Sequence, residues 1–342
     1  MFAGLRKPTD LIVIVVTLVA YGCPVQAIVH AFGLDERTVA SWRERAGQHC
    51  EQVHHALVEQ GQLDLVHVQA DEIRVKGCKM TVWMGLALMV STRLWLAGTV
   101  SLTRDTALAD RLMQQVRRCA QSMRALLVCT DGWAPYPNSI KRAFREKVKE
   151  TLGRGRACLR VWPQLHIGTV IKHTVKHRLA TITRRMAYGS LKRAAVLLHR
   201  SRGGTMLNTA IIPRFNGTMR QRLATLTRKC RHAARRLEAL HTGMYLLGTT
   251  YNFCWPHHEL SHVRDSATGK RHVAQPRTPA MAAGLTDHVW TISELLCYKI
   301  APAFWVAPKR RGRPRTRPLP DPTRPKRPRG RPRKQVLCAT TT

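Results

Sequence analysis

Acidic side chains are scarce in this chain of 342 residues. It has 20 Asp and Glu against 57 Lys and Arg, which gives a formal net charge of +37 with histidine neutral. A protein this basic repels itself unless a polyanion lies against it, and each phosphate that it neutralises releases counterions. The shortage of acid therefore predicts a nucleic-acid partner and binding that weakens steeply with salt.

Two further absences narrow the class of protein. None of the ten cysteines forms a CxxC pair, which argues against a zinc ribbon and favours reduced thiols in a cytosol. The apolar run at residues 11–20 follows Arg6 and Lys7, as in a secretory signal peptide, but Asp10 directly precedes it. It is also too short to span a bilayer, which takes about 20 apolar residues. We expect a cytoplasmic, nucleoid-associated protein with no membrane partner, and a cleaved signal is the alternative.

Arginine and proline dominate residues 308–334. This stretch holds thirteen Lys or Arg, eight Pro and a single acid, Asp321. So many prolines prevent a helix, and the composition cannot bury a core, so we expect residues 301–342 to be a disordered basic tail. Arg-Gly-Arg-Pro occurs twice in it, and the paired arginines are Arg311 with Arg313 and Arg329 with Arg331.

Both copies resemble the AT-hook core. The A·T minor groove is narrow and strongly negative, and it attracts Arg, while a Gly between two Arg adds no side chain to collide with the groove floor. The tail therefore predicts binding to double-stranded DNA, including the A·T-rich minor groove. A general polybasic tail for RNA, membrane or solubility is the alternative.

Helical patterns fill the first part of the chain. They predict helices at residues 9–21, at 24–32 and from 35 or 36 past Trp42, with a turn at Gly33. Residues 23–47 resemble a helix-turn-helix of the kind found at the front of bacterial transposases. We place this DNA-binding domain at residues 9–47 and a connector helix at 48–62. The candidate DNA contacts are Arg37, Ser41, Arg43 and Arg45, and an ordinary three-helix packing unit is the alternative.

From residue 63 the hydrophobic period changes. Residues 63–75, 81–92, 94–102 and 125–132 predict strands, and residues 106–122 predict a helix between the last two strands. We therefore expect an α/β core at residues 63–300, with one mixed sheet and flanking helices. A basic, poorly patterned insertion occupies 138–165, residues 167–186 predict an extra hairpin, and residues from 213 through 236 predict a long basic helix. Thr291 and Glu294 have the spacing of a capping box.

Two aspartates stand at the ends of predicted strands. Asp71 belongs to the first strand, and Asp131 ends the fourth. If these strands are neighbours, both carboxylates emerge at one edge of the sheet, where they could hold Mg²⁺ or Mn²⁺ for an in-line displacement on phosphate. Asp71 and Asp131 are therefore the candidate catalytic and metal-binding residues. The alternative is that each Asp caps a turn, because Asp-Gly is a strong turn signal.

The order of these features resembles the RNase H-like core of DDE transposases of the insertion-sequence-one type. The matching residues are Asp71-Glu72, Trp83, Thr130-Asp131-Gly132-Trp133 with Tyr136, and Ile212-Pro213-Arg214-Phe215-Asn216 followed by Arg220, Arg222, Leu226, Arg228 and Lys229. The resemblance covers roughly residues 20–300. It implies an RNase H-like fold, Mg²⁺-dependent DNA end cleavage and strand transfer, and a homo-oligomer on DNA ends. It also implies DNA contacts by Arg214, Asn216, Arg220, Arg222, Arg228 and Lys229.

Pro213 is the main departure from the family pattern, because it stands where the third acid is expected. Strand alternation sends Glu72 to the face opposite Asp71, and Glu238 would lie out of reach along a continuous helix. Glu146 or Glu150 could fold back from the insertion. The simplest hypothesis is a transposase-like DNA-binding protein with impaired catalysis. A non-enzymatic DNA-binding regulator or chromatin-type protein, and a nuclease without strand joining, remain as alternatives.

The residues from His258 to His262 match the H-E-x-x-H pattern of zinc proteases. That chemistry needs both histidines one turn apart on a helix and a third ligand. Here Pro256 lies just before the pattern, no third ligand stands out, and the 16 histidines of the chain make chance matches common. The pattern therefore does not predict a protease.

Overall fold

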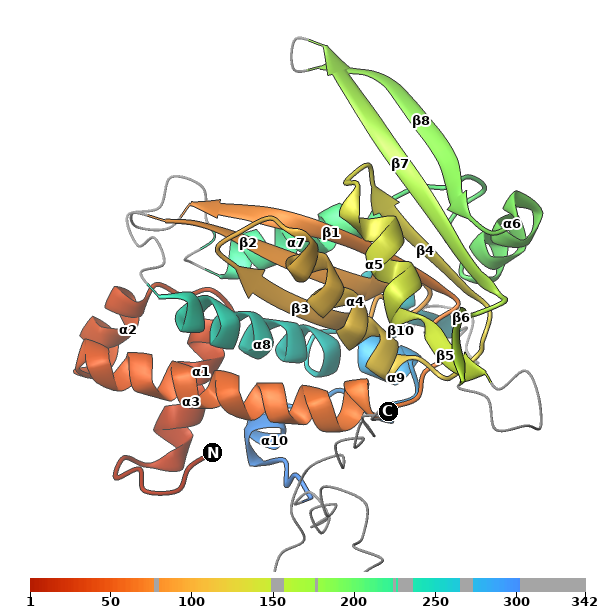
Figure 1. Cartoon of the computed structure of the whole chain (residues 1–342). Helices are drawn as coiled ribbons and strands as arrows, with labels where there is room; N and C mark the ends of the chain where they lie inside the picture. Colours follow the sequence, from red (N-terminus) through yellow and green to blue (C-terminus); the bar gives the residue numbers. More distant parts are fainter. Residues whose placement is uncertain are drawn as a thin grey trace, which may run out of the picture. The chain divides into compact units, whose positions relative to one another are not determined.

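A six-stranded mixed sheet forms the centre of residues 1–300 (Figure 1). The computed structural model describes residues 1–76, 80–148, 157–175, 178–223, 226, 236–264 and 273–301. The strand order is β3-β2-β1-β4-β7-β8; β4 is parallel to β1 and β7, and the other neighbours are antiparallel. The strands are β1 His67–Lys76, β2 Thr81–Met89, β3 Trp95–Ser101, β4 Leu126–Asp131, β7 Leu165–Val175 and β8 Arg178–Tyr188. The predicted α/β class with a mixed sheet is confirmed.

Helices cover both faces of the sheet. On β2, Gly85 faces Leu112 of α4 (Thr106–Cys119), which packs beside α5 (Pro135–Ala143). On β3, Gly98 pairs with Leu86, the residue after Gly85, and faces Met244 of α8 (Leu237–Phe253). Successive residues of a strand point to opposite faces, so α4 and α5 cover one face and α8 covers the other. The face of α8 also carries α6 (Leu191–Arg200) and α7 (Ile211–Arg222).

Three helices precede the sheet, as predicted: α1 Thr9–Ala20, α2 Val25–Phe32 and α3 Glu36–His54. Gly33 ends α2 in the left-handed conformation, and the Asp35 carboxylate caps α3 by accepting from the Arg37 N–H. The predicted break near residue 48 does not occur, because α3 continues to His54 and into a π-helical turn, His55–Glu59. Gly47 lets α3 pack closely on α8, since a Cβ there would collide with Thr242 (Figure 1).

The region between residues 135 and 236 differs in part from the sequence prediction. The insertion contains α5 and a separate two-stranded sheet of β5 (Arg145–Val148) and β6 (Cys158–Val161). The predicted hairpin is confirmed as β7 and β8. The predicted helix from residue 213 through 236 is wrong, because α7 ends at Arg222, where Leu223 turns to an extended conformation with φ −90° and ψ 99°. The predicted basic tail lies outside the described residues.

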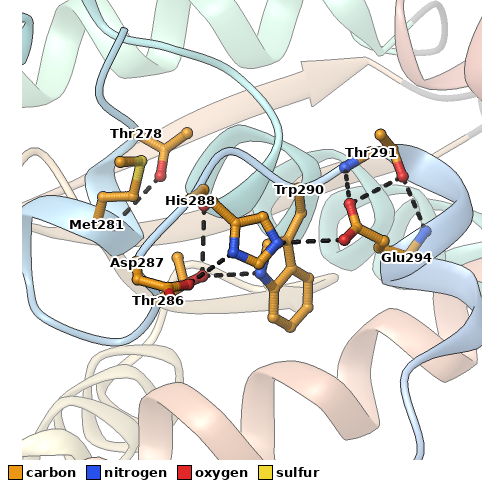
Figure 2. Close-up of polar contacts among 8 residues, drawn as sticks. All are labelled: Thr278, Met281, Thr286, Asp287, His288, Trp290, Thr291 and Glu294. Carbon is orange, nitrogen blue, oxygen red and sulfur yellow. Dashed lines mark hydrogen bonds and ion pairs between the residues drawn. The ribbon is translucent and has the colours of Figure 1, made fainter. Parts of the chain in front are cut away.

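The C-terminal part of the described chain carries short elements: a 3₁₀ turn His258–Leu260, β9 His262–Arg264, β10 Val273–Gln275, α9 Pro279–Ala282 and α10 Ile292–Cys297. The predicted capping box is confirmed (Figure 2): the Thr291 hydroxyl accepts from the Glu294 N–H at 3.1 Å, and the Glu294 carboxylate accepts from the Thr291 N–H at 2.7 Å. His258 and His262 lie on a 3₁₀ turn and a strand, so they do not share the helical face that a zinc protease needs.

Among the described residues, no helix combines the length and the apolar character that crossing a bilayer requires. The apolar helix α1 has 12 residues, and its side chains Ile12, Val15, Val16 and Ala20 are buried in the core of the protein.

Candidate functional site

Asp71 and Asp131 lie together, as the sequence predicts. Strands β1 and β4 are parallel neighbours whose pairing ends at Ala70 with Thr130, so the next residue of each strand reaches the same edge of the sheet. Carboxylate oxygens of Asp71, Glu72 and Asp131 lie within 4.8 Å of one another. Within the part of the chain that the structure describes, this acidic cluster is the one grouping of three possible metal ligands.

Glu72 corrects the prediction that strand alternation removes it from the site. Asp71 pairs with Leu86 and so faces α8, while Glu72 pairs with Gly85 and faces α4, as alternation requires. However, β1 and β4 are not paired beyond Ala70 and Thr130, and Asp71 Oδ1 accepts from the Glu72 N–H at 2.8 Å. The two carboxylates therefore meet beyond the last β1–β4 pair, although their side chains leave β1 on opposite faces.

A cavity of about 570 Å³ opens at this edge of the sheet. Asp71, Asp131 and Arg104 line it, and Lys172 of β7 and Pro213 of α7 border it from other elements. Pro213, which the resemblance places where a third acid is expected, therefore borders the same cavity as the two aspartates. Because Pro213 is exposed and carries no ligand atom, its position offers nothing to a cation.

Arg104 is a site residue that the sequence analysis missed. Its guanidinium forms ion pairs with Glu72 and, at 3.6 Å, with Asp131, and it lies over the rings of Trp83 and Trp133 at 5.1 and 4.6 Å. No motif marks this arginine. The available signal is topological, because β3 runs parallel to β1 and β4, so the residues that follow β3 emerge at the same edge of the sheet.

Burial and mutual repulsion control the protonation of the acidic cluster. Burial, and then the charge of Asp131, raise the pKa of Asp71 and also that of Glu72. The Tyr136 hydroxyl donates to Glu72 at 2.9 Å, and burial together with this carboxylate raises the pKa of the Tyr136 phenol. The site thus concentrates negative charge in a partly dry environment, where a cation is favoured.

Asp131 also meets the alternative prediction of a turn cap. Its Oδ1 accepts from the Trp133 N–H at 3.1 Å, which closes the turn after β4. Its Oδ2 faces Arg104 at 3.6 Å. One carboxylate therefore shapes the turn with one oxygen and contributes to the cluster with the other.

Asn216 of α7 holds Asp71 in place. It was predicted to contact DNA, but its side chain is buried, and its Nδ2 donates to Asp71 Oδ2 at 2.9 Å. Its Oδ1 is buried and makes no hydrogen bond among the described residues. Gln69 of β1 fixes the start of α7 by accepting from the N–H groups of Ile211 and Ile212 at 3.0 and 3.1 Å. Asn216 is therefore a positioning residue of the acidic cluster.

The predicted DNA contacts on and after α7 have different surroundings. Arg214 is 77% exposed and pairs with Glu259 at 2.9 Å. Arg220 lies near enough to Asp71 for its charge to oppose the rise in the pKa of that carboxyl. Arg222 donates to the Tyr21 carbonyl at 2.9 Å and covers the ring of Trp255, so it anchors α7 to the end of α1. Arg228, Lys229 and the tail arginines Arg311, Arg313, Arg329 and Arg331 lie outside the described residues.

The predicted DNA contacts on α3 are only partly at the surface. Arg37 and Ser41 are exposed one turn apart on this helix. Arg45 is exposed and donates to the Ala3 carbonyl at 3.1 Å. Arg43 turns inward, because its Nε is buried without a hydrogen bond among the described residues, and burial lowers its pKa. The exposed face of α3 therefore presents Arg37 and Ser41 most freely.

The alternative third acids lie elsewhere. Glu146 on β5 pairs with Arg117 and accepts from the Ser122 hydroxyl at 2.7 Å and the Trp162 indole at 3.3 Å, so its carboxylate is engaged away from the cluster. Glu238 begins α8 and does not join the acidic cluster. Glu150 lies outside the described residues.

No protein-family model and no curated protein matches this chain.

Proposed function

We propose that this protein is a transposase-like DNA-binding protein whose acidic cluster holds Mg²⁺ or Mn²⁺ and cleaves and joins DNA ends. One observation carries the proposal: carboxylates from three positions converge at the carboxyl edge of two adjacent parallel strands, and two of them, Asp71 and Asp131, line an open cavity. Hard oxygen ligands at such an edge suit divalent cations that act on phosphate.

The arrangement of strands supports an RNase H-like core. Three antiparallel strands are followed by a helix, a parallel strand β4 and a further parallel strand β7, with helices on both faces. This is the order that the resemblance to DDE transposases leads one to expect. The helices α2 and α3, joined by the turn at Gly33, support a helix-turn-helix in front of it.

Glu72 supplies the carboxylate that Pro213 cannot. Together with Asp71 and Asp131 it would give a divalent cation three carboxylate ligands, the hard oxygen donors that Mg²⁺ prefers. Arg104 pairs with Glu72 and Asp131 and lines the cavity. With these carboxylates engaged by a cation, its guanidinium would be available to a DNA phosphate.

The remaining side chains have distinct tasks. A bound divalent cation would polarise the phosphodiester and activate an attacking hydroxyl. Asn216 and Tyr136 hold Asp71 and Glu72 through single hydrogen bonds of 2.9 Å each. Lys172 at the cavity wall adds positive charge where the DNA backbone would lie.

Manganese binding and plasmid nicking test the proposal. Purified wild type is titrated with Mn²⁺ by calorimetry and incubated with supercoiled plasmid in Mn²⁺. We expect Asp71→Asn and Glu72→Gln each to weaken Mn²⁺ binding by about 10-fold to 100-fold, which is the usual loss of affinity when a metal site loses one of its partner residues. Each substitution should also abolish nicking. The matched control is Glu146→Gln, because Glu146 lies outside the cavity and should leave both properties unchanged. Unaltered Mn²⁺ binding in Glu72→Gln would show that Glu72 is not a ligand.

A second candidate is a non-enzymatic DNA-binding regulator. The neutral Pro213 at the cavity and the ion pairs of Arg104 with two of the three carboxylates favour it. It predicts DNA binding by the wild type with neither Mn²⁺ binding nor nicking. In that case Pro213→Glu should gain Mg²⁺-dependent nicking, because it returns a carboxylate to the wall of the cavity.

A further inference from the structure

Strands β7 and β8 extend beyond the sheet to which they belong. Strand β4 pairs with β7 from Leu165 to Val170, but β7 continues to Val175 with β8 as its partner. Beyond Val170, therefore, the two strands form a ribbon that projects past the rest of the sheet (Figure 1). We call residues 172–175 of β7 and 180–182 of β8 the β-arm.

The β-arm is open to solvent on both faces. Lys172, His173, Thr174 and Val175 are all exposed, although successive strand residues point to opposite faces. On β8, Ala180 and Thr181 are exposed, and Ile182 is half-buried against the core. An isolated two-stranded ribbon is marginal in water, so the contribution of such an arm lies in what it binds.

The charge of the region selects a polyanion as the partner. The sequence between Glu150 and Glu238 contains no Asp or Glu and 20 Lys or Arg. Within the β-arm, Lys172 is exposed and basic, and no residue is acidic; Arg184, at the base of the arm, donates to the Leu207 carbonyl at 2.9 Å. An acid-free ribbon of this kind complements phosphates and repels a basic partner.

The position of the β-arm favours a long duplex over a small anion. Lys172 and its neighbour Ile171 line the cavity of the acidic cluster, so the arm begins at the site where DNA would be cut. The major groove of B-DNA is about 12 Å wide and admits a two-stranded β-ribbon. A duplex that held the arm in its groove would therefore continue past the mouth of the cavity.

We infer that the β-arm binds duplex DNA and guides it to the acidic cluster. The guiding role rests on the proposed function, whereas binding of DNA by the arm does not. The arm is a further DNA contact, separate from the contacts predicted on α3, on and after α7, and in the tail. His173, Thr174 and Thr181 of the arm are exposed and can donate to phosphate oxygens or base edges.

A pair of isosteric double variants tests the contribution of charge. Thr174 and Thr181 are exposed on the β-arm, so Thr174→Glu with Thr181→Glu adds two negative charges without removing a basic residue. In the full chain at moderate salt, we expect this variant to bind a labelled 60-base-pair duplex about tenfold more weakly. Thr174→Gln with Thr181→Gln should bind within about twofold of the wild type, because the size changes alike and the charge does not. Equal binding by all three proteins would overturn the inference.

A cross-link locates the contact independently of the tail. Val175 is 62% exposed, so a photoreactive benzoylphenylalanine can replace it without disturbing the core. We expect irradiation to link this position to the duplex. Capture of a second copy of the chain, or no link to DNA while DNA is bound, would refute the arm as a DNA contact. The Thr174→Glu, Thr181→Glu variant should bind Mn²⁺ as tightly as the wild type does. If the wild type bound no Mn²⁺, the proposed function would be refuted, and the inference that the arm binds DNA would stand.

Discussion

Burial sets the charge state of single histidines in this protein, and His54 is one of them. Its Nε2 donates to the Leu96 carbonyl at 3.0 Å, its ring lies against Trp95, and burial lowers its pKa from 6.5 to about 4. In the unfolded chain His54 takes up a proton below about pH 6.5, whereas in the folded chain it stays neutral down to about pH 4. Stability is therefore lost as the pH falls through this window, and His54 should account for about 2 kcal/mol between pH 7 and pH 5.

Urea unfolding of His54→Gln at pH 7 and pH 5 checks this expectation. Glutamine can still donate to the Leu96 carbonyl but does not titrate. We expect the variant to be less stable than the wild type at pH 7, because the ring contact with Trp95 is lost. Its further loss on going to pH 5 should be smaller than that of the wild type by about 2 kcal/mol. Equal losses in both proteins would mean that His54 does not govern the acid response.

Single residues also mark the limit of what the sequence could predict about the site. The proximity of Asp71 and Asp131 was predictable, because each follows the last pair between the parallel strands β1 and β4. The prediction that Asp71 ends its strand was wrong, because β1 continues to Lys76 along β2. The place of Glu72 was not predictable, because alternation gives the face of a side chain but not the point where the neighbouring strand stops. Arg104 follows β3 in an irregular segment, and its role depends on the aromatic rings and carboxylates that the fold brings around it.

Close approach between elements depends on glycine at particular helix positions. Gly248 of α8 lies against the fully buried Trp95 of β3, and an added Cβ would sit 2.7 Å from Trp95 Cδ2 and closer still to two other ring carbons. Gly217 of α7 is the matched control, since a Cβ there meets nothing within 4 Å. Gly248→Ala should cost about 1–3 kcal/mol through overpacking, whereas Gly217→Ala should stabilise by up to about 1 kcal/mol through helix propensity.

Chemical unfolding followed by circular dichroism measures both substitutions. A stable Gly248→Ala protein would mean that α8 and β3 do not meet as closely as described. The control separates this effect from the general preference of helices for alanine, because both glycines lie within α-helices.

The elements themselves were predictable where the hydrophobic period was strong. The strands β1 to β4 and the helix α4 follow clear alternating or helical patterns, and the structure has them near the expected bounds. The end of α7 was not predictable, because Arg, Leu and Lys favour a helix beyond residue 222 and propensity is a weak guide. Arg222 instead docks on Tyr21 and Trp255, and Leu223 packs under Gly243 of α8, so tertiary contacts end the helix.

Positive charge is spread over the whole molecule and is not confined to the tail. Residues 301–342 hold 13 Lys or Arg and one Asp, so +12 of the +37 net charge lies there and +25 remains in residues 1–300. Residues 1–300 form a compact unit of their own, which makes a chain that ends at Ile300 a reasonable test protein. We expect this shortened chain to bind duplex DNA with lower affinity than the full chain and with a smaller dependence on salt.

Fluorescence anisotropy across a salt series distinguishes the contributions of body and tail. The logarithm of the binding constant falls with the logarithm of salt concentration by about 0.9 for each phosphate neutralised, so removal of the tail should lower this slope by several units. The affinity lost on removal of the tail should be larger for an A·T-rich duplex than for a G·C-rich one, because the two Arg-Gly-Arg-Pro copies resemble minor-groove binders. If the shortened chain bound no DNA, the contacts inferred for α3 and the β-arm would fail together. If instead the slope stayed the same, the tail would make no phosphate contacts, and the charge of residues 1–300 would account for the binding.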